Sequence, residues 1–186
     1  MTSSLLFWVV LAVLAFWAVG AYNRLVRKRS EANTAFGALE AEFAKQVALA
    51  LQCLPEEEEA GQSQFEGGSA FWSGLRGAVL QFNASLAAAK ARPLDPERMA
   101  ALGAAHEVLN MSWDRAERDD AHDLAGPRLP ENISAERQQL VRLSVAATEQ
   151  FNNAVAQYND AIDQFPASVL AWIFGFRAAR GLRARP

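Results

Sequence analysis

The chain has 186 residues, of which 51% are hydrophobic, and a formal net charge of −3 at pH 7. This length suits one domain with a short additional segment, and the absence of a basic face across the chain argues against nucleic-acid binding. A single cysteine, Cys53, excludes an internal disulfide bond and agrees with a reducing compartment.

The N-terminal region contains an apolar run, residues 5–22, without a charged or amide side chain. As a helix it would span roughly 27 Å, close to the hydrocarbon thickness of a bilayer. We therefore predict a transmembrane helix at 5–22, preceded by a tail at 1–4. A cleaved signal peptide, with Ala18 and Gly20 flanking the cut, is the alternative. The tail lacks a basic residue and the apolar run is long, which favours an uncleaved anchor.

Basic side chains follow this run directly and indicate its orientation. Because basic flanks tend to remain cytoplasmic, we predict an external N-terminus and a cytoplasmic domain. The opposite orientation is the alternative. The flanking residues that we expect at the membrane interface are Arg24, Arg27, Lys28 and Arg29.

The rest of the chain shows helical periodicity. Apolar residues recur at three- and four-residue steps from Leu25 to Leu54, so the first helix is predicted to continue from the span until Pro55. The acidic, Gly/Gln/Ser-rich stretch 55–68 predicts an exposed loop. A second helix is predicted from Ser69 to about Ala91.

Two further helices are indicated by their start and stop signals. Asp95-Pro96-Glu97 supplies an N-cap, a proline at the first helical position and an acid in the first turn. The last helix is predicted to begin near Asn132 or Ser134 and to end before Pro166. No alternating β-branched run is present. The predicted fold is all-α, an N-terminal transmembrane helix followed by an antiparallel up-and-down four-helix bundle over residues 23–165.

The last helix carries polar residues beside a heptad seam of small and aromatic residues. Asn152, Tyr158 and Asn159 are the candidates for fixing helix register or for contacting a partner. Both interpretations remain open from the sequence.

The tail, residues 166–186, combines an apolar aromatic stretch that is too short to span a bilayer with several arginines. Such a composition suits an interfacial segment, with rings at the acyl boundary and cations at anionic headgroups. The alternative is that the tail caps the end of the bundle. The candidate interface residues here are Trp172, Phe174, Phe176, Arg177, Arg180 and Arg183.

Ionisable clusters give little indication of catalysis. Asp119, His122 and Asp123 would share a helix face and have metal-ligating side chains, but a solvated acidic surface is the favoured interpretation. His106 lies on an apolar stripe, where a buried, hydrogen-bonded histidine is expected. We predict no catalytic residue, cofactor, metal or small-molecule substrate. A metal-dependent hydrolase using His106 and His122 is the least favoured alternative.

Several short motifs resemble the LemA family. They are Tyr22-Asn23-Arg24-Leu25-Val26 after the apolar run, the block from Phe151 to Ile162, Phe165-Pro166, and the block from Ala171 to Phe176. The chain departs from the family in lacking a proline in the stretch from Lys45 to Leu51, and residues 55–129 match little. The resemblance implies a bacterial membrane-anchored helical bundle without established enzymatic activity. Some relatives take part in magnetosome formation.

Together these features predict a single-pass protein of the bacterial inner membrane that organises protein partners, or copies of itself, without catalysis. A periplasmic domain is the alternative location. A membrane-linked sensor that transmits a shift through the first helix is the alternative function.

Overall fold

The computed structural model describes residues 2–54, 66–121 and 129–182, and within these ranges it contains five helices and no strand. The all-helical class predicted from the sequence is confirmed for these residues. The helices are α1 (Thr2–Cys53), α3 (Glu66–Ala91), α4 (Pro96–Ala121), α5 (Ile133–Asp163) and α6 (Ala167–Phe174).

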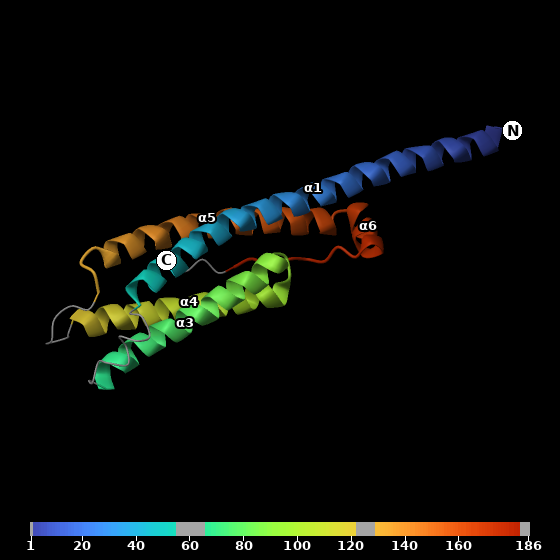
Figure 1. Cartoon of the computed structure of the whole chain (residues 1–186). Helices are drawn as coiled ribbons and strands as arrows, with labels where there is room; N and C mark the ends of the chain where they lie inside the picture. Colours follow the sequence, from blue (N-terminus) through green and yellow to red (C-terminus); the bar gives the residue numbers. More distant parts are fainter. Residues whose placement is uncertain (1, 55–65, 122–128, 183–186) are drawn as a thin grey trace.

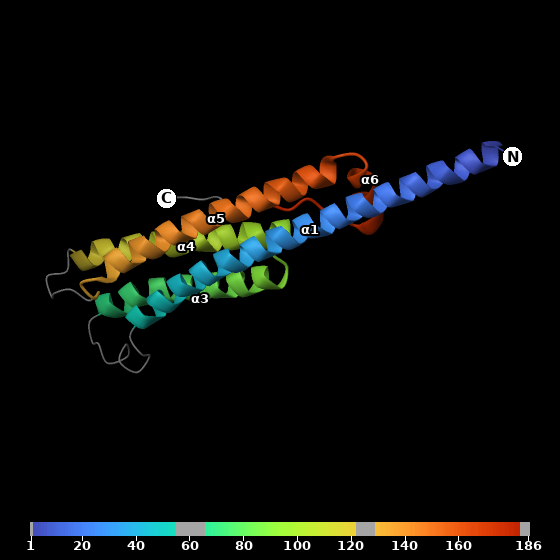
Figure 2. The ribbon, with the colours of Figure 1, turned by 90° about the horizontal axis from the view of Figure 1, so that it is seen from above.

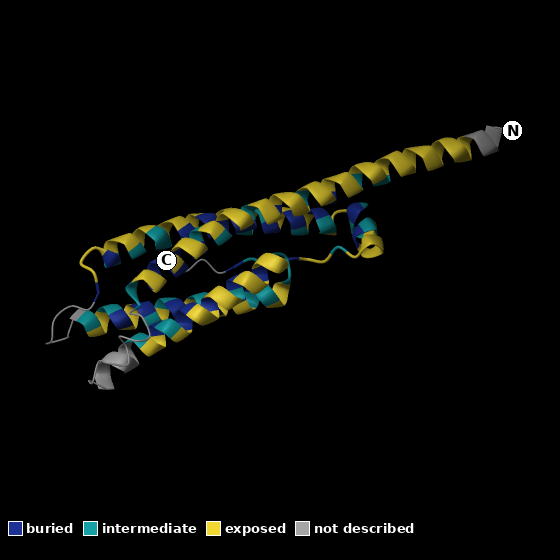
Figure 3. Ribbon diagram, viewed as in Figure 1, coloured by how far each residue is buried: buried dark blue, intermediate teal, exposed yellow. Residues whose placement is uncertain are grey.

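Helix α1 is continuous over 52 residues and combines two different surfaces. Residues 6–17 are exposed at every position, and the first fully buried residue is Leu25 (Figure 3). This apolar segment makes α1 long and apolar enough to cross a membrane. As the sequence predicts, the helix runs without a break from the apolar segment into the core, and it ends two residues before Pro55.

The core lies between two helix pairs (Figures 1 and 2). Helix α1 packs along α5 in the opposite direction, α3 and α4 form a hairpin, and α1 also packs against α3. The predicted stripe on α1 is buried, and its aromatic residues join the pairs: Phe36 lies 5.6 Å from Phe151, and Phe43 lies 5.3 Å from Phe82, between ring centroids.

Helices α4 and α5 do not pack closely against each other in the part of the chain that the structure describes. The two helix pairs are therefore joined mainly through α1, and the side between α4 and α5 is open. The chain after α6 runs through this space (Figure 1).

The helix ends follow the sequence signals in part. Asp95 caps α4 as expected, because its Oδ1 accepts hydrogen bonds from the backbone N–H groups of Glu97 and Arg98 at 3.0 and 3.2 Å. Helix α3 begins at Glu66 rather than at Ser69, because the position of a helix end carries only a weak local signal. The predicted loop falls largely on residues 55–65, which lie outside the described ranges.

Candidate functional site

The C-terminal segment (residues 176–182) turns back from α6 and runs along α5. Helix α6 ends at Phe174 and is followed by Gly175, which adopts a left-handed conformation with φ 70°. The N–H of Phe176 bonds to the Ala171 carbonyl at 2.9 Å. A left-handed residue at this position is easily supplied by glycine, which has no Cβ to clash. The turn redirects the chain into the space between α4 and α5.

Two asparagines of α5 bind the backbone of this segment. Asn159 donates to the Ala179 carbonyl and accepts from the Ala179 N–H, both at 2.9 Å. Asn152 makes the same pair of bonds with Leu182, at 2.6 Å to its carbonyl and 2.8 Å from its N–H. Each primary amide therefore satisfies both polar groups of one tail residue, as a neighbouring strand would.

Tyr158 adds a third contact from the same helix. Its hydroxyl donates to the Arg177 carbonyl at 3.1 Å. Burial raises the pKa of Tyr158, with a smaller opposing effect from Arg29, so the phenol keeps the proton that this bond requires.

Two side chains of the C-terminal segment, three positions apart, are buried in the interior. Ala179 and Leu182 are buried, whereas Arg177 and Arg180 are exposed. A Cβ built on Gly103 of α4 would lie 3.4 Å from Leu182 Cδ2, so the segment reaches across to α4. The structure thus assigns Asn152, Tyr158 and Asn159 a tail contact, where the sequence suggested register between helices or an external partner.

A cleft of about 1070 Å³ extends beyond this segment between α4 and α5. Its lining includes His106, Asn110 and Asp114 from α4, Arg137 from α5, and Arg180 and Leu182 from the C-terminal segment. This cleft had no sequence signal, because its lining comes from three distant parts of the chain.

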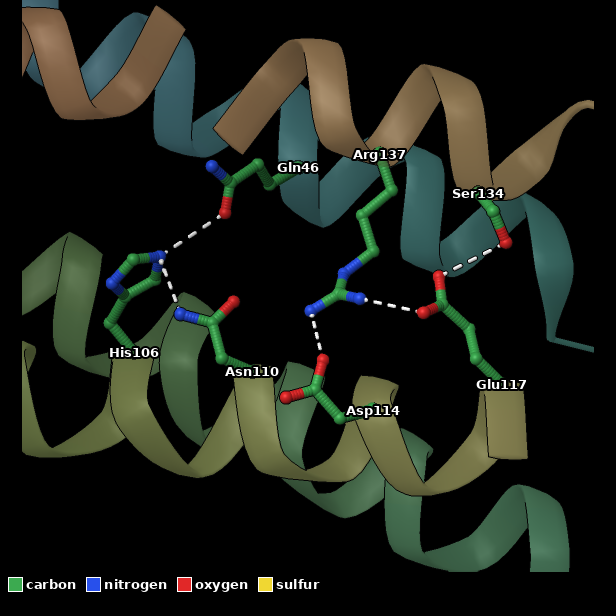
Figure 4. A network of polar contacts seen from close by, with 7 residues as sticks. All are labelled: Gln46, His106, Asn110, Asp114, Glu117, Ser134 and Arg137. Atoms are coloured by element: carbon green, nitrogen blue, oxygen red, sulfur yellow. Dashed lines mark hydrogen bonds and ion pairs between the residues drawn. The ribbon is translucent and has the colours of Figure 1, made fainter. Parts of the chain in front are cut away.

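Arg137 bridges α5 to α4 across the cleft (Figure 4). Its guanidinium nitrogens lie 2.7 Å from Asp114 Oδ1 and 3.0 Å from Glu117 Oε2. Glu117 also accepts from the Ser134 hydroxyl at 3.3 Å. The Arg137 guanidinium carbon lies 5.7 Å from the centre of the Trp113 ring, so an aromatic face supports the cation.

His106 occupies the inner wall of the cleft. Its ring centroid lies 4.6 Å from that of Phe43 and 5.3 Å from that of Phe82. Its Nε2 lies 3.3 Å from Gln46 Oε1 and 3.5 Å from Asn110 Nδ2, so it donates to the first or accepts from the second, according to tautomer (Figure 4). Burial, and secondarily the Arg137 charge, lowers the pKa of His106 from 6.5 to about 4.

The candidate metal ligands are not brought together in the part of the chain that the structure describes. No group of three or more His, Cys, Asp or Glu side chains there could hold a metal ion. Asp119 lies beside Arg115, with its Oδ2 3.6 Å from the Arg115 Nε. His122 and Asp123 lie outside the described ranges.

Phe174 of α6 and Phe176 lie against Tyr22 at the end of the apolar segment. Trp172 and Phe174 are exposed, whereas Phe176 is half-buried with the Arg29 guanidinium 5.7 Å from its ring centre. Among the basic flank residues, Arg24 is exposed, Arg27 lies 3.7 Å from Glu31, and Lys28 bonds to Gln157 of α5 at 2.7 Å. Of the candidate tail arginines, Arg177 and Arg180 belong to the segment along α5, and Arg183 lies outside the described ranges.

No family model, curated protein or solved structure matches this chain.

Proposed function

We propose that this chain is a membrane-anchored interaction or scaffolding protein of the LemA type, without catalytic activity. The observation that carries the proposal is the continuity of α1, which joins an exposed apolar segment to the core without a hinge. An anchor of this kind concentrates a rigid helical surface at one membrane face. We further propose that the four long helices form an antiparallel up-and-down bundle. We also propose that the protein is located in the bacterial inner membrane.

The surroundings of the proposed anchor support a membrane interface at its C-terminal end. Helix α6 packs against α1 through Leu25, Ala167 and Ala171, while Trp172 is 85% exposed. An exposed indole beside an apolar span suits the interfacial region of a bilayer. The basic flank from Arg24 to Arg29 would face headgroups on the cytoplasmic side, with the N-terminus outside.

Cysteine labelling in intact cells tests anchoring and orientation together. Burial, and secondarily the Glu136 carboxylate, raises the pKa of Cys53, which makes it a slow reporter. We would therefore replace it by alanine and introduce Ser3→Cys or Ala135→Cys, the latter at an exposed position of α5. A membrane-impermeant maleimide should label Ser3→Cys in intact cells and Ala135→Cys only after lysis. Labelling of both in intact cells would exclude a spanning anchor.

The interaction role predicts that exposed apolar side chains of the helices contact other proteins. Leu80 of α3 and Met111 of α4 are 58% and 56% exposed. A photo-crosslinking residue at either position should give discrete larger products in cells, whereas the same residue at exposed Gln81 should give fewer. Equal yields at Leu80 and Gln81 would contradict a specific apolar contact.

The cleft between α4 and α5 favours a sensor as the second candidate function. A sensor requires a ligand-accessible space and a rigid connection to the membrane, and one wall of the cleft is α5, which packs along α1. Spin labels at exposed Ala101 of α4 and Gln138 of α5 would report the width of the cleft. A sensor should populate two distances, and a passive scaffold one.

A further inference from the structure

We propose that the surface of α5 and α4 that holds the C-terminal segment is a binding site for an extended peptide of a partner protein, with the chain's own segment as its internal ligand. The partner peptide would carry the pattern small–any–Gly–aliphatic, as Ala179 to Leu182 do. This inference rests on the proposed interaction role, and its test uses binding by the purified chain rather than events at the membrane.

The spacing of the two asparagines matches an extended backbone. Asn152 and Asn159 lie seven positions apart, which is about 10.5 Å along a helix. Ala179 and Leu182 lie three positions apart, which is about 10 Å in an extended chain. The two runs are antiparallel, because the earlier asparagine binds the later tail residue. The two asparagine amides therefore recognise main-chain groups of the segment, and this recognition does not depend on most of its side chains.

Selectivity comes from three positions of the segment. Ala179 and Leu182 are 8% and 7% exposed, so they enter the interior, and Leu182 meets Gly103 of α4. A Cβ at Gly181 would collide with the Asn152 amide Oδ1 and lie 3.1 Å from its Cγ. Asn152 is itself held by both Leu182 bonds, so a side chain at Gly181 would break the contact that positions the peptide.

The internal segment is suited to exchange with a partner. Only two of its side chains are buried in the residues from Arg177 to Leu182, and it leaves α6 through the left-handed turn at Gly175. A tethered ligand competes at an effective concentration in the millimolar range. A free peptide should therefore bind poorly to the intact protein and well once the internal segment is displaced.

Gly181→Val in the full-length chain displaces the internal segment and leaves the α5 asparagines intact. The matched control is Arg180→Val, because Arg180 is exposed one position earlier. We would measure fluorescence anisotropy of a labelled peptide of residues 175–186 with each protein in detergent. The peptide should bind Gly181→Val at least 10-fold more tightly than the wild type or Arg180→Val. A peptide that itself carries Gly181→Val should not bind.

Two further variants distinguish displacement of the internal segment from a folding defect. Leu182→Glu also displaces the segment, by placing a charge at a buried position, and should bind the peptide as Gly181→Val does. Adding Asn152→Ala and Asn159→Ala to either variant should abolish binding. The proposal is overturned if both displaced variants keep the wild-type circular dichroism and melting temperature but bind no peptide. Binding that survives loss of both asparagines, or wild-type dimers held through the tail, would also overturn it.

Discussion

The ring centroids of Tyr22 and Phe174 lie 5.0 Å apart, so the last turn of the apolar segment is in direct contact with α6. Phe176 approaches the same tyrosine at 6.1 Å, and Trp17 lies 5.4 Å from Phe165. Residues more than 140 positions apart in the sequence thus form two groups of aromatic contacts. These contacts hold α6 and its flanking residues beside the end of the apolar segment.

Trp172 should lie at the bilayer interface. In a variant whose other tryptophans are phenylalanine, lipids brominated near the headgroup end of the acyl chain should quench its fluorescence strongly. A variant retaining only Trp113, which is 3% exposed in the core, should be quenched little. Equal quenching of the two would contradict the interfacial position.

Helix α6 packs against α1 and α5 mainly through small residues, and this contact should not accommodate a large side chain. Ala171 is 2% exposed and packs with Leu25, Ala161 and Ala167. Ala171→Phe should overpack this contact at a cost of about 1–3 kcal/mol and detach α6. Quenching of Trp172 should then change, whereas Val169→Phe, at an exposed position of the same helix, should leave it unaltered.

Arg137 should stabilise the distal part of the molecule. Its side chain is 13% exposed and bridges α5 to two carboxylates of α4. Arg137→Met should lower the free energy of unfolding by about 1–3 kcal/mol, because Glu117 then loses its charge-assisted bond in a partly buried position. Arg142→Met, at an exposed position of the same helix, should change it by less than about 0.5 kcal/mol. Thermal unfolding in detergent measures both, and equal losses would argue against the bridge.

Folding stability should depend on pH through His106. The pKa of this histidine is lowered from 6.5 to about 4, so between these values the unfolded chain binds a proton that the folded chain does not. Stability should therefore fall as the pH drops from about 6.5 to about 4, by up to about 3 kcal/mol. His106→Gln should flatten this part of the profile of melting temperature against pH. His122→Gln reports what the other histidine contributes, and a steep profile in His106→Gln would disprove the assignment.

Much of the helical framework could be predicted from local signals. The stripe from Leu25 to Ala50 repeats at helical spacing, and Asp95-Pro96 combines a cap with a proline where a helix tolerates it. Such signals depend on residues within one or two turns of each other. They are therefore readable without knowing the partner helix.

The site was less predictable because its contacts are between distant parts of the chain. The position of Asn152 and Asn159 beside a heptad seam marked them as candidates for a contact, but an asparagine amide pairs equally well with a helix, a tail or a partner. The tail's aromatic and arginine content suggested a membrane interface or a cap on the end of the bundle, and nothing in it indicated that Gly175 turns the chain back. The cleft and the Arg137 bridge depend on how far α4 stands from α5, which no local pattern encodes.

The continuous helix α1 also fixes the distance between the apolar segment and the far end of the molecule. From Tyr22 to Cys53 the helix rises about 47 Å. The helix is unbroken, so it has no hinge about which the attached helices could tilt. If the apolar segment is fixed in a bilayer, the far ends of α1 and α4 stand at a set height above it. A protein that docked there would need its own contact surface at that height, so α1 would restrict the proposed partners by their dimensions as well as by their chemistry.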